Sequence, residues 1–243
     1  MNKLLHTRYG YPAAARELIS AIGQCLRLLG TDHLPDSNLE VPEDFFGINV
    51  APGDSPDCDE YTLARLGDLG INQVRMDFSY DSPGGPASRL LDRLLQAGID
   101  VMLDLLPPLD EARSIDKNVQ AQQRWRRFVD DCLRNYAGKV ALFEIGNTPN
   151  RGKWSGFSSR GFLIANHIAY EVAADYSVQL VGPNVSDFEP LYNASYLGLM
   201  RRLGATPAMQ SDNLFVERVP VSYTHLTLPT KIKWWGGGGG GGG

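Results

Sequence analysis

The feature that most constrains the fold is a regular alternation of apolar runs and amphipathic segments, which begins at residue 45. The short apolar runs are typical of strands buried on both faces, and the longer segments repeat apolar residues at helical spacing. The predicted strands are 45–50, 72–80, 100–106, 139–146, 178–184 and 213–218, and the predicted helices are 59–70, 86–98, 118–138, 160–176 and 191–205. This order predicts parallel strands covered by helices.

The connections between these segments differ in length. Helix-to-strand steps are short and contain Gly70, Gly98 or Gly138, whereas the strand-to-helix loops are longer and polar. This asymmetry is typical of a (β/α)8 barrel, whose working loops follow the carboxyl ends of the strands. The alternative is a doubly wound sheet, but the chain has no glycine-rich phosphate turn of the GxGxxG or GxxxxGK[ST] type. We therefore expect an α/β fold: a truncated TIM (β/α)8 barrel of about five βα units plus a sixth strand.

Residues ahead of the barrel form a separate region. The segment 12–30 has apolar residues at helical spacing, opens with Pro12 and closes with Gly30, as helix ends prefer. The polar, proline-containing stretch that follows is typical of a linker. Residues 1–44 are thus an expected N-terminal helix and linker, and residues 45–219 are the expected partial barrel.

The chain ends in a sequence that we exclude from the fold. Residues 221–243 read "VSYTHLTLPTKIKWWGGGGGGGG". This resembles a translated sequencing adapter followed by poly-G, and Pro220 fits the codon that would precede it. We expect residues 220–243 to be a non-native disordered tail, and the gene to continue past Val219, so that the chain is a truncated, metagenomic fragment.

Composition excludes several functional classes. The chain has 243 residues, 43% of them hydrophobic and 21% charged, which suits one large globular domain. A net charge of -5 without a basic run argues against nucleic acid as a partner. No apolar run approaches the roughly 18–20 residues of a membrane span, and no signal peptide is seen, so a cytoplasmic location is expected. The three scattered cysteines fit free thiols; oligomeric state is not indicated.

Polar side chains gather where the predicted strands end. In a barrel, alternate strand residues point inward, and those at the carboxyl ends face the pocket. The candidates are Asn49, Arg75, Asp77, Tyr80, Asp104, Glu144, Asn147, Thr148, Asn184, Asp187, Glu189, Asn213, Glu217 and Arg218. The set contains no His or Cys, so we expect no metal, no cofactor and no Ser-His-Asp arrangement. Carboxylates, amides, arginine and an aromatic residue are the groups that sugar chemistry uses.

Each leading candidate also has a purely structural interpretation. Arg75 and Asp77 fit an interior ion pair, and Asp104 fits a cap on the following loop. Glu144 fits a hydrogen-bonding residue inside the barrel, and Trp154 fits a cover over its own loop. The mid-helix residues Trp125 and Phe128 are expected in the core.

Three motifs resemble the large clan of retaining glycoside hydrolases with (β/α)8 barrels. "GINQVRMDFSY" (residues 70–80) is similar to the clan's second strand, G-[IV]-N-x-[VI]-R, and "FEIGNTPNRGKW" (143–154) to its fourth-strand signature, W-E-[IV]-x-N-E-P-N. "VGPN" (181–184) is similar to its fifth strand end. More narrowly, "EIGNTPNRGKWSGF" (144–157) resembles glycosyl hydrolase-like proteins that accompany bacterial envelope-polysaccharide genes.

The resemblance implies specific roles. Arg75 matches the arginine at the pocket floor, and Asn147 matches the residue that contacts the sugar 2-hydroxyl. Thr148 stands where the clan has its acid/base glutamate, and a threonine hydroxyl cannot exchange a proton as a tuned carboxyl does. The clan's seventh-strand nucleophile would lie beyond Val219. The resemblance therefore implies an O-glycosyl hydrolase for the full-length protein and an inactive fragment.

Two functional hypotheses follow. In the first, the protein hydrolyses a bacterial surface polysaccharide, with Glu144, Asp104, Asp187 or Glu217 replacing the acid that is absent at Thr148. In the second, it is a non-catalytic carbohydrate binder or an accessory of polysaccharide biosynthesis. A barrel lyase or isomerase is a third possibility. Under either of the first two hypotheses, the expected carbohydrate-binding residues are Asn49, Arg75, Asp77, Tyr80, Asn147, Trp154 and Asn184.

Overall fold

The computed structural model describes residues 45–80, 84–187 and 189–213, and the residue pairs 15–16, 19–20 and 22–23. The three pairs lie within the predicted helix 12–30 and are helical. The rest of residues 1–44 lies outside the described residues, as do Glu217, Arg218 and the predicted tail 220–243.

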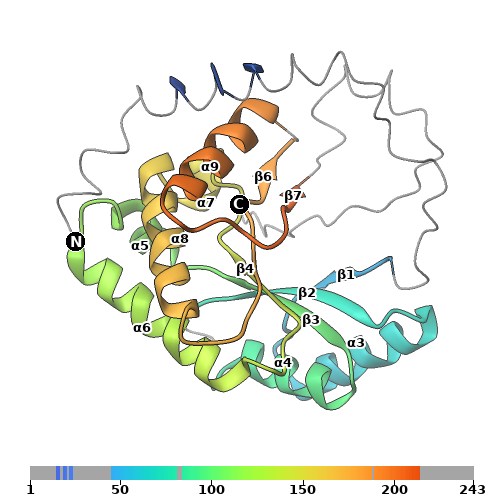
Figure 1. Ribbon diagram of the computed structural model, residues 1–243. Helices are drawn as coiled ribbons and strands as arrows, with labels where there is room; N and C mark the ends of the chain where they lie inside the picture. The colour runs from blue at the N-terminus through green and yellow to red at the C-terminus, as the bar shows by residue number, and fades with distance from the viewer. Residues whose placement is uncertain are drawn as a thin grey trace, which may run out of the picture.

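Five parallel strands form one sheet in the order of the chain. They are β1 (Ile48–Val50), β2 (Gln73–Phe78), β3 (Asp100–Leu105), β4 (Leu142–Ile145) and β5 (Leu180–Val181). Each unit adds its strand beside the previous one, whereas a doubly wound sheet reverses its order at a switch point. The helices between the strands lie outside the sheet (Figure 1). The α/β fold with the strand order of a partial barrel is thereby confirmed.

The predicted helices are present, with ends within a few residues of the prediction. They are α3 (Pro56–Leu69), α4 (Pro86–Gln96), α6 (Val119–Tyr136), α8 (Ser159–Ala173) and α9 (Pro190–Arg202). Three of them begin with a proline, whose fixed φ suits a first helical position. The side chain of Asn118 accepts hydrogen bonds at the start of α6, and that of Ser158 accepts one at the start of α8. Gly70 ends α3 in the left-handed region, with a φ of 64°.

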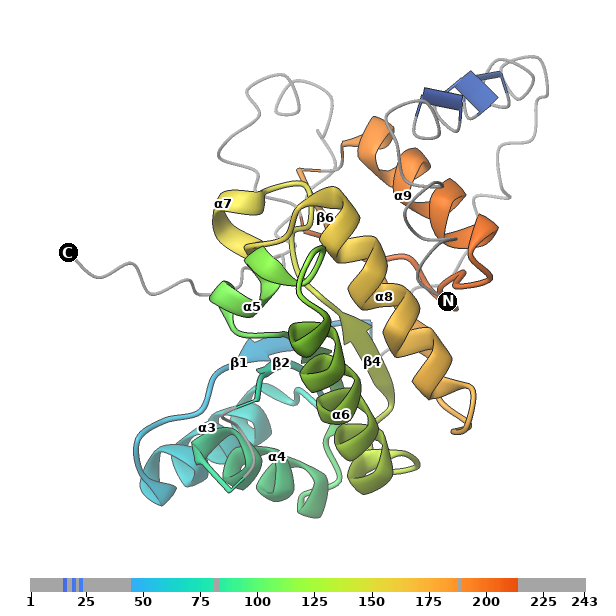
Figure 2. The same cartoon turned by 90° about the vertical axis from the view of Figure 1, so that its left-hand side faces the viewer.

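Two short helices were not predicted. They are α5 (Leu109–Ser114) and α7 (Gly152–Ser155), and both lie in strand-to-helix loops. Each is too short to show a helical repeat of apolar residues. Figure 2 shows α5 and α7 near each other, at the end of the sheet where the strands finish.

The sheet continues past β5 through a second short pairing. The strand predicted over 178–184 is observed only at β5, and β6 (Val185–Ser186) follows directly. Here β6 pairs in parallel with β7 (Asp212–Asn213), and Val181 bridges to Met209. The segment that ends in β7 therefore lies beside the β5–β6 segment, as the sixth strand of a barrel would. Of the predicted strand 213–218, only its first residue is described.

The core lies between the outer face of the sheet and the helices. Val74, Met76 and Phe78 of β2 are buried there with leucines of α4 and with Trp125 and Phe128 of α6. The predicted core positions of Trp125 and Phe128 are thus confirmed. Burial of a large apolar side chain contributes about 1.5–3 kcal/mol, so this layer stabilises the sheet edge that carries the polar site.

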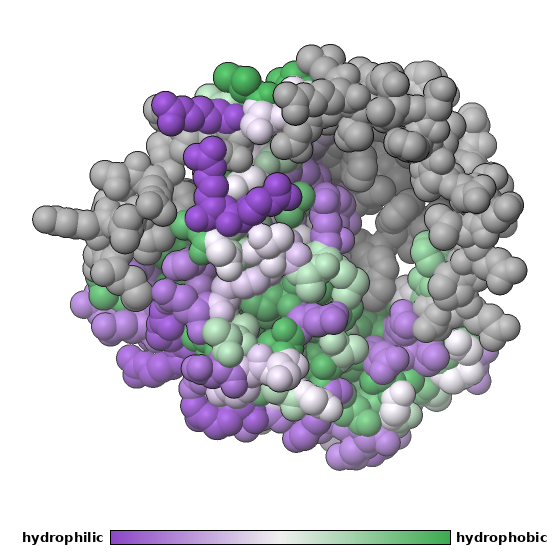
Figure 3. Space-filling model, viewed as in Figure 1, coloured by the Kyte–Doolittle hydropathy of each residue, from purple (hydrophilic) through white to green (hydrophobic). Residues whose placement is uncertain are grey.

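The outer surface is mixed in character. Figure 3 shows hydrophilic residues along the lower left rim, with hydrophobic residues gathered toward the middle of that face. Within the described ranges, no helix is both long enough and apolar enough to cross a membrane.

Candidate functional site

Strand register places the polar residues in two layers on one face of the sheet. Asn49 is paired with Arg75 across β1 and β2. Two residues further along, Asp77 is paired with Asp104, and Asp104 with Glu144. Side chains separated by two residues on a strand point to the same face, so these five share the face opposite the helices. The structure therefore brings them together, as the sequence predicts.

Arg75 is the centre of this cluster. Its Nε donates to Glu144 Oε2 at 2.7 Å, and its Nη1 donates to Asp77 Oδ1 at 2.9 Å. Its Nη2 also contacts Asp104. The side chains of Arg75, Asp104 and Glu144 are 4%, 0% and 0% exposed, whereas that of Asp77 is 53% exposed. One guanidinium thus faces three carboxyl groups, two of them fully buried.

The excess of acids shifts the proton affinities of the cluster. Burial raises the pKa of Asp104 well above its usual value; Glu144 and Asp77 raise it further, and Arg75 opposes them. Burial lowers the pKa of Arg75, but the charges of Asp104, Glu144 and Asp77 outweigh it and raise this pKa overall. The arrangement favours a permanently charged Arg75 and makes Asp104 easier to protonate than an ordinary carboxyl.

Three side chains of this cluster have open hydrogen-bonding capacity. Among the described residues, Glu144 Oε1 and Asp104 Oδ1 have no hydrogen-bond partner, and neither atom of the Asn49 amide has one. Buried polar atoms in proteins are nearly always satisfied by protein, water or ligand. These atoms mark the positions at which a hydroxyl-rich ligand or ordered water would bind.

The turn after β4 is shaped by packing beneath it. Gly146 has a φ of 71°, and a side chain there would meet the rings of Phe157 and Phe162 at 3.2 and 3.3 Å. Asn147 and Thr148 follow at the mouth of the barrel, which is the edge formed by the carboxyl ends of the strands, and both are half-buried. Phe157 is only 3% exposed, so it supports this turn from inside and offers no ring face to a sugar.

Asn147 and Thr148 join the turn to neighbouring strand ends. Asn147 Oδ1 accepts from Asn213 Nδ2 at 2.7 Å, and the Thr148 amide donates to the Asn184 carbonyl at 3.1 Å. Thr148 and Asn184 both have positive φ, at 47° and 51°. A β-branched residue in this region is a genuine outlier, and such strain gathers at functional sites. The structure thus places Asn147, Thr148 and Asn184 together above the carboxylate cluster, at the end of β4.

A second ion pair network, which the sequence analysis missed, ties the same loops. Arg151 Nη2 contacts Asp187 Oδ2 at 2.6 Å and Glu189 Oε1 at 2.7 Å. Asn150 accepts from the Ser186 amide at 2.9 Å and donates to Glu189 at 3.0 Å. Asp187 is therefore engaged in holding the loops. No local pattern of the sequence predicts this contact, because the two acids follow the next strand and belong to a different loop.

Two of the predicted aromatic residues lie in different places. Trp154, on α7, is 61% exposed at the carboxyl ends of the strands. Tyr80 lies on the helix-facing side of the sheet, where its ring centroid is 4.9 Å from that of Phe128 and 6.3 Å from that of Trp125. The structure therefore does not bring Tyr80 to the Arg75 cluster.

Metal ligation has no candidate in the part of the chain that the structure describes, because no group of three His, Cys, Asp or Glu side chains there is arranged to hold an ion. The carboxylates of Asp77, Asp104 and Glu144 are directed to Arg75 instead. Glu217, the remaining predicted catalytic residue, lies outside the described residues.

Comparisons with known proteins give structural likeness only. No family model matches the chain, and no curated protein sequence matches it. A solved structure of N2152 from Neocallimastix frontalis is similar with a TM-score of 0.49 and 16% identity, over 69% of this chain and 43% of that one. A rice β-glucosidase is similar with a TM-score of 0.46 and 12% identity, over 60% of this chain and 48% of that one. An L-ribulose 3-epimerase is similar with a TM-score of 0.46 and 17% identity, over 69% of this chain and 59% of that one. The chain thus spans less than two thirds of each, and these likenesses carry no conclusion about activity.

Proposed function

We propose that this barrel is glycoside hydrolase-like and binds or acts on a bacterial surface polysaccharide. The observation that carries the proposal is the convergence of Arg75, its carboxylates and the Asn147 turn at the carboxyl ends of adjacent strands. This is the edge at which barrels bind their ligands. The resemblance of the β2 and β4 motifs to the retaining glycoside hydrolases supports the choice of carbohydrate as ligand.

The groups at the mouth suit a sugar ring. Asn147 uses its oxygen to accept from Asn213, and its amide nitrogen donates to none of the described residues, so that this nitrogen can donate to a ligand hydroxyl. The exposed ring of Trp154 offers an apolar face to the C–H groups of a pyranose. Arg75 and its carboxylates form the polar floor beneath them.

Binding is the role that this geometry supports best. Thr148 occupies the turn where a proton carrier is expected, and its hydroxyl does not ionise near neutral pH. Asp104 has the raised pKa of an acid catalyst, but it is completely buried and held by Arg75. Hydrolysis is the second candidate, and the raised pKa of Asp104 is the observation in its favour.

The test of binding is calorimetric titration of the whole chain with oligosaccharides released from bacterial envelope glycans. Asn147→Ala and Trp154→Ala should each weaken binding about tenfold, since each removes one directed contact. Lys153→Ala is the matched control, because Lys153 is an exposed neighbour on the same short helix. No heat with any oligosaccharide, or equal affinity in all three variants, would reject the proposal.

A separate assay tests hydrolysis. Dinitrophenyl glycosides have a leaving group that departs without a proton donor, so they bypass the missing acid at Thr148. Turnover of dinitrophenyl and alkyl glycosides at enzymatic rates, with only the alkyl glycoside turnover lost in Asp104→Asn, would replace the binding role with the catalytic one. Binding without turnover is the expected result.

A further inference from the structure

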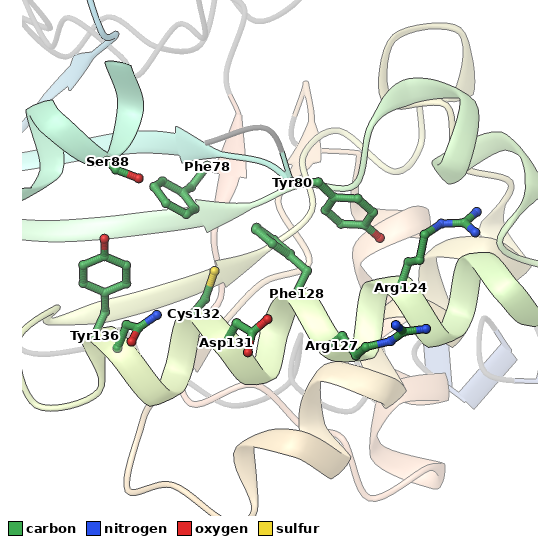
Figure 4. A pocket seen from close by; sticks show the side chains of 10 residues that line it. Phe78, Tyr80, Ser88, Arg124, Arg127, Phe128, Asp131, Cys132 and Tyr136 are labelled. Carbon is green, nitrogen blue, oxygen red and sulfur yellow. The ribbon is translucent and has the colours of Figure 1, made fainter. Parts of the chain in front are cut away.

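A cavity lies on the helix side of the sheet, away from the Arg75 cluster. Helix α3 packs against α4, α6 against α8, and α8 against α9. Between α4 and α6 there is instead a cavity of about 270 Å³, open to the surface and lined by residues of β2, α4 and α6 (Figure 4). This volume lies near the lower end of small-molecule pockets, and it suits a ligand with a single ring.

Aromatic rings form the walls of this cavity. Phe78 stacks with Phe128 at a centroid distance of 6.2 Å and meets Tyr136 edge-on at 6.0 Å. Tyr80 closes one end against Phe128. Phe78 and Phe128 are 2% and 7% exposed, so the rings are held in place by the core. Fixed aromatic walls favour a flat apolar ligand, because rings prefer offset-stacked and edge-to-face contacts.

The charges at the mouth are unequal. Arg124 and Arg127 both lie at the Tyr80 end of the cavity (Figure 4). Arg124 is paired with Glu111 at 2.5 Å, and Asp131 on the rim is paired with Arg134 at 3.0 Å. Within the described residues, Arg127 has no hydrogen bond or ion pair to a side chain. The rim therefore presents one positive charge that no described acid neutralises.

The cysteine in the wall of the cavity is chemically inert. Cys132 lines the cavity and is 3% exposed, and burial raises the pKa of its thiol to about 12. A thiol at such a pKa carries almost no thiolate near neutral pH, so it acts as a small apolar surface. The cavity thus offers a binding site rather than a nucleophile.

We propose that this cavity binds a small aromatic carboxylate, with its ring against Phe128 at the Tyr80 end of the cavity and its carboxylate on Arg127. The planar guanidinium matches a carboxylate with two parallel hydrogen bonds. The site is independent of the Arg75 cluster, because Phe78 and Asp77 are adjacent on β2 and point to opposite faces. The inference therefore stands whether or not the barrel binds a polysaccharide.

Calorimetry with phenylacetate and its neutral analogue phenylacetamide tests this assignment on the whole chain. The wild type should bind phenylacetate about tenfold more tightly than the amide, because only the acid gains a charge-assisted contact. Arg127→Gln should remove that preference and leave amide binding unchanged. Arg113→Gln is the matched control, since Arg113 is an exposed arginine on α5 that does not line the cavity.

A second variant locates the ligand. Cys132→Leu extends an apolar side chain into the cavity and should abolish binding of both probes, while a cooperative melting curve shows that the chain still folds. Absence of binding to the wild type, equal affinity for acid and amide, or an unchanged preference in Arg127→Gln would each overturn the proposal. Unchanged binding by folded Cys132→Leu would also overturn it.

Discussion

The Nε of Arg75 on β2 donates to Oε2 of Glu144 on β4 at 2.7 Å, so the contact spans the intervening strand. Asp104 on that middle strand binds the same guanidinium. Three consecutive strands are therefore tied at their carboxyl ends by one buried cation. The contact makes the polar floor of the candidate site a structural element as well as a chemical one.

Arg75→Met should destabilise the chain strongly. It leaves Asp104 and Glu144 buried beside each other without a cation, and breaking a buried pair in this way costs about 3–5 kcal/mol. Urea unfolding at neutral pH measures the loss. The control is Arg93→Met, which removes an exposed pair with Glu60 and should cost less than about 1 kcal/mol.

The same variant should be rescued by removing the acids. Adding Asp104→Asn and Glu144→Gln to Arg75→Met removes both buried acids and should recover most of the lost free energy of unfolding. A single Arg75→Met variant as stable as Arg93→Met would contradict the central place given to Arg75.

The pKa of Asp104 predicts a pH dependence of stability. A carboxyl whose folded pKa is raised holds a proton in the native state that the unfolded state has released, so the free energy of unfolding falls as pH rises. The fall begins near the ordinary pKa of about 4 and continues upward until the folded pKa is passed. Urea unfolding across this range should show a slope that is smaller in Asp104→Asn.

The matched control for this effect is Asp110→Asn, because Asp110 is 94% exposed and should leave the slope unchanged. A wild-type chain whose stability rises steadily with pH above 4, with the same profile in Asp104→Asn, would show that Asp104 is ionised in the native state.

Thr148→Gly should stabilise the chain by about 1 kcal/mol. Its φ of 47° is unfavourable for a β-branched residue, and glycine adopts this region without a steric penalty. Thr62→Gly, within helix α3, is the control and should lose about 0.2–0.4 kcal/mol instead. The melting temperatures of both variants, compared with the wild type, test this prediction. A loss of stability in Thr148→Gly would show that side-chain contacts of Thr148 outweigh the backbone strain.

Arg151→Gln should loosen the loops that surround the mouth. It removes the cation that Asp187 and Glu189 share, while Asn150 keeps its own contacts. Faster hydrogen exchange at the amides of residues 147–150 and 184–187 is expected, with α6 unchanged as an internal reference. Unaltered exchange at these loop amides would show that Asn150 alone holds them.

The elements that the sequence predicted well are those with a strong local signal. Helices such as α6 combine a long apolar repeat with a capping residue, and Arg75, Asp77, Asp104 and Glu144 follow from strand alternation alone. Parallel register brings equivalent strand ends to one edge of the sheet. A strand pattern is therefore enough to predict that these side chains meet.

Tyr80 lies two residues after Phe78, so strand alternation itself predicts the helix side for it, and there it packs against Phe128 and Trp125. Other features depended on three-dimensional packing. Arg151 joins acids from a different loop, and no local pattern encodes that contact. The cavity between α4 and α6 likewise depends on how closely two helices approach.

The most direct test of the account is an amide NMR titration of the whole chain with an envelope oligosaccharide. Binding at the mouth predicts that the side-chain amide of Asn147 and the indole of Trp154 shift in a saturable way. The chemical shift of the side-chain amide of Asn135, in the α4–α6 cavity on the opposite face, should not change. Shifts confined to other surfaces, or no saturable shift at Asn147 and Trp154, would contradict carbohydrate recognition at the ends of the strands.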